Sequence, residues 1–459
     1  MIINIKNWGV VSSIKIDISR SLIILCGPNS TGKTYVSYLV YSLFSKITRE
    51  LDYNSSVSLP SEVLDEIVKK GEFELNEQII QHLCNEFCKY IKKKIVPLIF
   101  AINPEESKIL FKNFKLSIEL TDSDISSVMK SGIYLDEFNF RNLLLNIHKD
   151  TKSQKISIAV SHKDNNNKDI ISESTVSEIS NRLISKLLLR FIFKLSDSRM
   201  LTVERNSIYT FSKELSLVRS EFDPFSFGKL QRYPLAVTES LRIAEDLQMV
   251  KKNKGFFHEY AMQLEENLLK GNIEINENGA IEFIPHQLKD NSPRLPIYMT
   301  SSIVKTMASL IVFLKHIGHQ NDLLIIDEPE MNLHPDSQII LTRIFAELVN
   351  KGLKLIISTH SDYIIREFNN MIMANEIVKG KYKLEENESI PYEKSQLIPV
   401  ENTEVFYFNF NNKTGKVTAK SVEVTKLGFD IESIDETIES QTEITNFLAD
   451  ILKYGVCEQ

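Results

Sequence analysis

The N-terminal segment changes from strand patterns to a helical pattern. Ile2–Ile5 and Ile14–Ile18 alternate apolar and polar side chains, which is typical of strands with one buried face. Leu22–Cys26 is apolar throughout and predicts a strand that is buried on both faces. From Thr34 onward the apolar residues recur at helical spacing. Residues 1–49 are therefore predicted to hold two edge strands, a central strand and a helix.

Helical spacing dominates residues 50–198. Glu77–Val96 and Val176–Phe193 have the pattern of long amphipathic helices, whereas Phe114–Leu120 and Lys155–Val160 alternate like strands. We expect this region to form a mostly helical lobe that is inserted into the fold.

The pattern of residues 199–271 predicts a return to the sheet, followed by a helical hairpin. Arg199–Tyr209 is predicted to be a strand, and Pro234–Lys252 and Gly255–Lys270 are predicted to be two helices. A short basic turn separates the two helices.

A β-hairpin and a βαβ unit are predicted within residues 272–375. Asn272–Ile275 and Ala280–Ile284 flank an Asn-Gly turn, and a helix follows over Ser302–Ile317. The βαβ unit consists of strands Leu323–Ile326 and Leu353–Ile357 around a helix at Asp336–Asn350. The tail of the chain, residues 376–459, is predicted to hold strands Glu404–Asn409 and Lys416–Thr425 and an end helix Ile434–Tyr454. The fold class is therefore α/β with a mixed or parallel sheet.

Composition places the 459-residue chain among folded globular proteins, because 42% of its residues are hydrophobic and 25% are charged. A net charge of −7 argues against a generally basic nucleic-acid coat, although it leaves room for a local basic face. No signal segment and no apolar run of about 20 residues is visible, so we expect no membrane contact and a cytoplasmic location. The chain has four cysteines, which are too few for a disulfide framework and favour a reducing cytosol: Cys26, Cys84, Cys88 and Cys457.

A phosphate-binding loop is predicted between the central strand and its helix. The loop fits the pattern G-x-x-x-x-G-K-[ST], and its residues are Gly27, Pro28, Asn29, Ser30, Thr31, Gly32, Lys33 and Thr34. The glycines let backbone N–H groups surround phosphates, Lys33 can reach the β- and γ-phosphates, and the Thr34 hydroxyl can bind Mg²⁺. The alternative is a glycine-rich turn without a ligand. Because the motif stands between a predicted strand and a predicted helix, as a phosphate loop must, we expect ATP and Mg²⁺ as cofactors.

Two carboxylates follow the buried strand at Leu323–Ile326. Asp327 is a candidate Mg²⁺ ligand, and Glu328 is a candidate for polarising the attacking water. An ordinary solvated acidic turn is the alternative. His360 follows the next buried strand, where an imidazole can reach the γ-phosphate; a structural histidine is the other interpretation.

These residues resemble the ABC-type ATPases of the SMC and OLD-like group. The resemblance covers about residues 1–45 and 272–368. It matches Asn332–Pro335 to the D-loop and His360 to the switch histidine. It implies ATP hydrolysis. The signature position falls on Ser301 and Ser302, where the usual Ser-Gly-Gly is missing, so an N-cap serine remains the alternative. Arg205 is a candidate polar residue near the nucleotide.

In such ATPases the signature of one protomer closes the phosphate loop of another. The resemblance therefore implies an oligomer of at least two copies. Sustained heptads are absent, which favours ATPases of bacterial anti-phage defence over SMC-like proteins of DNA repair or recombination, the alternative class. Beyond His360 the sequence has Glu401, Glu404 and Asp430 but no Asp-x-Asp of an appended nuclease, so we expect the chain to act through a partner. By size and arrangement it looks like the ATPase subunit of Septu-type systems, with PARIS-type systems as the competitor. A separate HNH-type nuclease is the implied partner, and direct DNA contact stays open. We expect a partner or trigger to bind the insertion from Glu50 to Leu195, because ATP chemistry does not need it.

Three weaker signals each have two interpretations. The basic run Lys89–Lys94 is either a phosphate-backbone patch or a solvated helix face. The pair Cys84 and Cys88, with His82 nearby, is either packed in the core or a zinc site. Trp8 is either a core residue or a platform for adenine.

Overall fold

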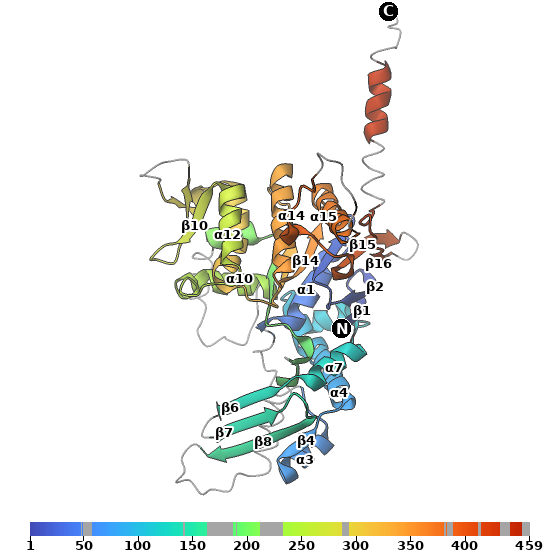
Figure 1. The fold of residues 1–459 in the computed structure, drawn as a ribbon, viewed down its shortest axis with the longest axis vertical. Coiled ribbons are helices and arrows are strands. Elements are labelled where there is room, and N and C mark those ends of the chain that lie inside the picture. The colour runs from blue at the N-terminus through green and yellow to red at the C-terminus, as the bar shows by residue number, and fades with distance from the viewer. Residues whose placement is uncertain are drawn as a thin grey trace, which may run out of the picture.

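A computed structural model gives the architecture of most of the chain (Figure 1). The residues that it describes are 1–46, 48, 57–140, 143–162, 187–189, 191–211, 233–286, 293–380, 382, 389–411, 415–431 and 441–451.

A nine-stranded sheet forms the centre of the molecule. Its strands in spatial order are β5 (Lys115–Glu119), β1 (Ile2–Trp8), β2 (Val11–Asp17), β16 (Lys416–Val422), β15 (Thr403–Asn411), β3 (Leu22–Cys26), β14 (Lys354–Thr359), β13 (Leu323–Asp327) and β9 (Ser198–Leu201). The run from β15 to β9 is parallel throughout, whereas β5, β1 and β2 pair antiparallel. The predicted mixed α/β sheet is thus confirmed.

The central strands are apolar throughout because both of their faces are covered. Ile23 and Ile325 point into one hydrophobic core, while Ile24 and Ile326 point into the other. The helices that cover the first core are α1 (Lys33–Phe44), α4 (Glu77–Tyr90) and α10 (Leu235–Glu245). The helices that cover the second core are α12 (His258–Leu264), α13 (Ser302–Val312), α14 (Pro335–Asn350) and α15 (Asp362–Gly380). Alternate side chains of one strand therefore stabilise two helical layers.

The region predicted as a mostly helical lobe, residues 50–198, contains more sheet than its pattern indicated. A four-stranded sheet lies at the bottom of Figure 1, and its strands are β4 (Glu72–Glu74), β8 (Lys155–His162), β7 (Leu143–Lys149) and β6 (Ile133–Phe140). In addition, β5 leaves the lobe and pairs with β1 in the central sheet. Most of the predicted helix Val176–Phe193 lies outside the described residues. The shorter helices of the chain are α3 (Ser61–Lys70), α5 (Val96–Ile99), α6 (Pro104–Leu110), α7 (Asp122–Lys130) and α11 (Leu247–Val250).

One predicted strand is mostly helical. Only the first residues of Arg199–Tyr209 extend, because β9 ends at Leu201 and residues 205–211 form helix. The helical turn brings Arg205 back toward the end of β13, where its guanidinium binds backbone carbonyls. The helical hairpin that was predicted next is present as α10 and α11 followed by α12.

The predicted β-hairpin is confirmed, and it belongs to a small separate sheet. This sheet consists of β10 (Gly271–Ile275), β11 (Ile281–Pro285) and β12 (Leu295–Pro296). Gly279 has a φ of 70° at the turn, which is the left-handed conformation that the Asn-Gly pair predicted.

The C-terminal hairpin pairs as predicted but is not a separate tail element. β15 and β16 are antiparallel partners, yet β15 lies against β3 and β16 touches β2. Of the predicted end helix, residues 441–451 are helical and the rest lies outside the described residues. None of the described helices is long and apolar enough to cross a membrane.

The structure decides two of the weaker signals. Trp8 is fully buried, its ring stacks 4.3 Å from that of Phe111, and its Nε1–H donates to the Tyr35 carbonyl, so it is a core residue and not an adenine platform. Burial raises the pKa of the Cys84 and Cys88 thiols to about 12. Both cysteines lie buried among the apolar side chains of the first core, so they pack there.

Candidate active site

The phosphate loop, residues 27–34, leaves the end of β3 with a backbone that ordinary residues adopt poorly. The φ values of Gly27, Ser30 and Gly32 are 131°, 61° and 87°. A Cβ at Gly27 would lie 2.3 Å from the carbonyl oxygen of Phe408 in β15, so only glycine fits between the two strands. The loop's outer residues are exposed: Pro28, Asn29 and Ser30.

Lys33 closes the loop from inside. Its Nζ donates to the carbonyl oxygens of Gly27 and Pro28, at 2.9 and 2.8 Å, and its side chain is buried. The Thr31 hydroxyl donates to the same Pro28 oxygen at 2.8 Å. Burial lowers the pKa of Lys33 to about 8, against the opposing effect of Asp327. An ammonium group at the start of α1, together with the N–H groups of that helix end, makes this loop an anion site.

Thr34 and Asp327 meet although 293 positions separate them. The sheet order places β14 between β3 and β13, so all three strands end at the same edge. There the Thr34 hydroxyl donates to Oδ2 of Asp327 at 2.9 Å, and the Ser358 hydroxyl donates to Oδ1. Burial raises the pKa of Asp327, and these two hydrogen bonds oppose that effect. A hydroxyl and a carboxylate side by side are the oxygen donors that Mg²⁺ prefers.

Glu328 adopts a strained backbone directly after Asp327. Its φ is 48°, and its N–H donates to the Ser358 carbonyl at 2.9 Å. The Arg205 guanidinium donates to the Asp327 and Glu328 carbonyl oxygens, each at 2.6 Å, and to the Thr202 carbonyl at 3.0 Å. A non-glycine residue in this region costs free energy, so these bonds hold the peptide where it is.

His360 lies just past the end of β14, with its backbone fixed by a second acid. Its N–H donates to Oε1 of Glu330 at 2.7 Å, and the Thr359 hydroxyl donates to the same oxygen at 3.0 Å. Burial lowers the pKa of His360, Lys33 lowers it further, and Asp327 opposes both. The imidazole is therefore neutral at pH 7 and within electrostatic reach of Lys33 and Asp327.

The candidate signature serines stand apart from this cluster. Ser301 and Ser302 are exposed at the start of α13, and the Ser301 side chain makes no capping hydrogen bond. Within the described residues, no hydrogen bond joins either serine to the phosphate loop. The segment Asn332–Pro335, which the resemblance matches to the D-loop, contacts the same helix, because Nδ2 of Asn332 donates to the Thr306 hydroxyl at 2.9 Å.

A family model for an AAA ATPase domain matches residues 1–365. The chain belongs to this AAA ATPase family. The AAA ATPase therefore binds and hydrolyses ATP. No curated protein matches its sequence.

Several solved structures are similar to this AAA ATPase at low identity. An SMC head domain from Thermotoga maritima is 10% identical, with 92% of this chain and 98% of that chain covered and a TM-score of 0.32. A Pyrococcus furiosus Smc head domain with an extended coiled coil, bound to the C-terminal domain of ScpA, is 11% identical, with 97% and 98% covered and a TM-score of 0.34. An SmcHead bound to the C-winged helix domain of ScpA is 12% identical, with 92% and 98% covered and a TM-score of 0.35.

Sequence reasoning missed two residues that support the AAA ATPase site. Ser358 and Glu330 were not singled out, although Ser358 is the register partner of Asp327 across β13 and β14. A βαβ prediction could have identified Ser358, since parallel neighbours end side by side. Glu330 gives no such signal, because its contact depends on the turn after Glu328.

Proposed function

We propose that ATP binds at the phosphate loop and is hydrolysed with Thr34 and Asp327 holding Mg²⁺. The hydrogen bond between Thr34 and Asp327 carries this proposal, because it joins the loop to the acidic strand end. A bound Mg²⁺ would neutralise charge on the phosphates. Glu328 polarises the attacking water, and neutral His360 hydrogen-bonds the γ-phosphate side of the site.

Two substitutions test these assignments. Lys33→Ala is expected to abolish ATP binding, because it removes the buried ammonium of the loop. Glu328→Gln keeps the loop intact, so we expect ATP binding within threefold of the unmodified protein and turnover reduced at least 100-fold. Binding is measured by calorimetry and turnover by phosphate release.

An exposed glutamate supplies the matched control. Glu423→Gln, at an exposed position after β16, is expected to leave both quantities unchanged. Retained nucleotide affinity in Lys33→Ala, or unmodified turnover in Glu328→Gln, would remove these residues from the proposed roles.

We propose further that the site is completed by a second copy. Ser301 and Ser302 are exposed at a helix start, which is a place where hydroxyl and backbone N–H groups can bind a γ-phosphate. Because nothing in the described residues of their own chain brings them to the phosphate loop, they would act on the loop of a neighbouring protomer. The assembly is then at least a dimer.

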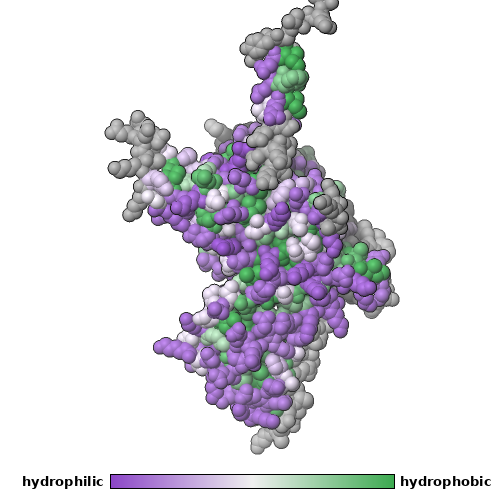
Figure 2. Space-filling view, turned by 90° about the vertical axis from the view of Figure 1, so that its right-hand side faces the viewer, coloured by the Kyte–Doolittle hydropathy of each residue, from purple (hydrophilic) through white to green (hydrophobic). Residues whose placement is uncertain are grey.

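The biological role that we propose is control of a separate nuclease, of HNH type, in anti-phage defence of the Septu kind. One surface supports partner binding. Helix 441–451 exposes an apolar stripe at helical spacing, visible as a green band in Figure 2: Ile444, Phe447, Leu448 and Ile451, each at least half exposed. Such a stripe is typical of a helix that binds a groove on another protein.

Affinity purification of the tagged chain from its native host, with and without ATP, tests this role. A stoichiometric small nuclease is the expected co-purifying protein. A version in which Phe447→Asp and Ile451→Asp interrupt the stripe is expected to lose it while keeping ATP turnover. Recovery of replication and repair proteins instead would support the SMC-like alternative.

A further inference from the structure

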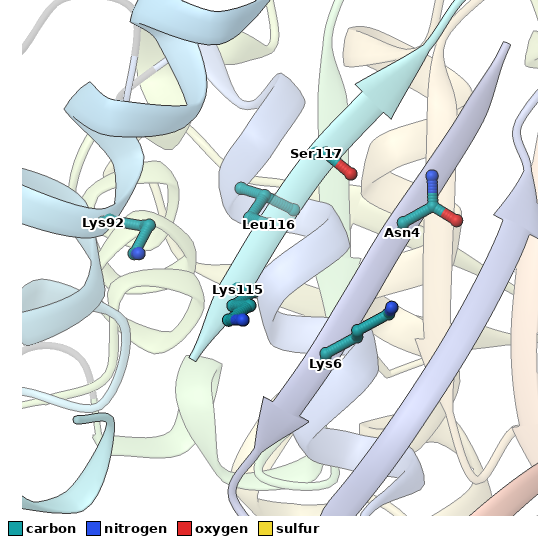
Figure 3. Close-up of a pocket in the computed structure, with 6 residues that line it drawn as sticks. All are labelled: Asn4, Lys6, Lys92, Lys115, Leu116 and Ser117. Atoms are coloured by element: carbon teal, nitrogen blue, oxygen red, sulfur yellow. The ribbon is translucent and has the colours of Figure 1, made fainter. Parts of the chain in front are cut away.

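A hollow of about 460 Å³ lies at the far edge of the central sheet, over β5 and β1. The sheet order β5-β1-β2-β16-β15-β3 separates it from the phosphate loop at the end of β3. Figure 3 shows the residues that line it: Asn4, Lys6, Lys92, Lys115, Leu116 and Ser117. The hollow is open to solvent, so a bound ligand would stay partly exposed.

A buried amide without partners lies in this hollow. Asn4 is 5% exposed, and neither its Nδ2 nor its Oδ1 forms a hydrogen bond with any described residue. Ser117 lies directly opposite Asn4 on β5, and Lys15 lies directly opposite it on β2. An unpaired buried amide loses its hydrogen bonds to water without replacement, so a structure rarely retains one without a ligand or water to satisfy it.

The lysines of the hollow repel one another. Lys6 and Lys115 are directly opposite on antiparallel strands, which destabilises a sheet when both residues are charged. Lys92 adds a third ammonium from the π-helix Ile91–Ile95, which continues α4. None of these three lysines forms an ion pair with a residue in the described ranges. An anion between them would remove the repulsion.

Acidic groups on the same face do not offset these charges. Asp17 and Glu119 lie opposite Ile2, at the other end of β1 from Lys6. Asp17 is already engaged by the amino group of Met1 and by Ser19. The face therefore has a basic end with free ammonium groups beside an unpaired amide. Both polar atoms of that amide are covered from solvent, so a ligand reaches them only when the Asn4 side chain rotates.

We propose that this hollow binds a nucleotide unit, with its phosphate on Lys6, Lys92 and Lys115 and its base or sugar on Asn4 and Ser117. An asparagine amide matches the N6 and N7 edge of adenine, which presents one donor and one acceptor. The same chemistry is present in a free mononucleotide and in a nucleotide of a single-stranded nucleic acid. The site is independent of ATP hydrolysis.

Binding is tested in the full-length Lys33→Ala protein, so that the phosphate loop does not contribute. One probe is a dye-labelled 12-nucleotide oligo(dA), followed by fluorescence anisotropy at several salt concentrations. The other probe is AMP, followed by calorimetry. Saturable binding of either probe is expected, and the probe that binds identifies whether the nucleotide is free or in a chain.

Substitutions in the hollow assign the binding. Lys6→Ala with Lys115→Ala is expected to weaken affinity at least tenfold; for the oligonucleotide it also lowers the salt slope by about 0.7, since the contact to one phosphate is lost. Asn4→Ala is expected to weaken affinity at least fivefold with the salt slope unchanged. The matched control is Lys254→Ala with Lys426→Ala, two exposed lysines elsewhere, which should bind like the parent.

The thermal midpoint without ligand separates binding from a purely structural role of these lysines. If they bind a ligand, the Lys6 and Lys115 double variant keeps or raises its midpoint, because like charges are removed; a structural role predicts a lower midpoint. Failure of both probes to bind, or binding that is unchanged in the folded lysine and Asn4 variants, would overturn the proposal.

Discussion

Arg205 supports the acidic strand end through backbone contacts alone. Its side chain is 3% exposed, and although burial lowers its pKa to about 10, it stays charged at pH 7. The two terminal nitrogens of one guanidinium bind the consecutive carbonyls of Asp327 and Glu328. A lysine ammonium cannot reproduce that planar fork. Arg205 is thus a positioning residue for the backbone on which Glu328 depends.

Arg205→Lys is expected to reduce ATP turnover at least tenfold while ATP affinity changes less than threefold, because the phosphate loop is untouched and the Glu328 backbone loses a donor. The measurement is kcat and KM by phosphate release, with calorimetric ATP binding in parallel. Arg294→Lys, at an exposed ion pair with Glu274, serves as control and should have unmodified kinetics. An Arg205→Lys protein with full turnover would contradict the positioning role.

The same residues show what sequence can predict at this scale. The motif predicts every residue of the phosphate loop, because its chemistry requires contiguous residue types, and the phosphate contacts themselves stay a prediction. Arg205 was only a weak candidate near the nucleotide, since its bonds to Asp327 and Glu328 cross more than 120 positions. No local pattern encodes a contact between a side chain and a distant carbonyl.

The existence of each strand was easier to predict than the strands with which it pairs. The alternation in β15 and β16 predicted a hairpin, but nothing in it indicated that β15 would lie between β16 and β3. Alternation reports which face of a strand is buried and not which strand pairs with it. The same limit explains why β5 was assigned to the inserted lobe and is found beside β1.

Glu404 of β15 hydrogen-bonds to Asp17 at the end of β2, and it makes the stability of the fold depend on pH. Its Oε2 accepts the N–H of Asp17 at 2.9 Å, and burial, with the nearby Asp17 carboxylate, raises the pKa of Glu404 to about 7. A carboxyl whose folded pKa is raised favours folding while protonated. Its stabilising contribution is therefore lost as pH rises from about 4.5 to 7.

Glu404→Gln, which stays neutral, is expected to be more stable than the parent at pH 8 by on the order of 1 to 2 kcal/mol, after allowance for partial exposure. Near pH 4.5 the two proteins should differ little. Thermal midpoints at both pH values measure the effect, with Glu423→Gln as control. Equal differences at pH 4.5 and pH 8 would rule out titration of Glu404 as the cause.

At the scale of the whole molecule, each chain carries one phosphate loop and one exposed serine pair on α13. If the serines act on a neighbouring protomer, two defective chains can complement each other. Lys33→Ala lacks a working loop, and Ser302→Glu lacks a working signature because the added charge repels phosphate.

Mixing Lys33→Ala with Ser302→Glu in equal amounts is expected to restore about a quarter of the unmodified activity, since half of the dimers are mixed and one of their two sites is intact. Each variant alone should be inactive. The control mixture contains Lys33→Ala and Glu328→Gln, which share the same half of the site and cannot complement. Activity of Ser302→Glu alone at the unmodified level would contradict a shared site.

The placement of β3 has a consequence for synthesis of the protein on the ribosome. Both strands that flank β3 come from the last third of the chain, β14 at 354–359 and β15 at 403–411. At about 5 to 20 residues per second, the phosphate-loop strand emerges roughly 15 to 75 seconds before its partners. During that time this fully apolar strand has neither of its two neighbours, so we expect the nascent chain to need protection from aggregation. Premature termination before residue 354 leaves an aggregation-prone fragment.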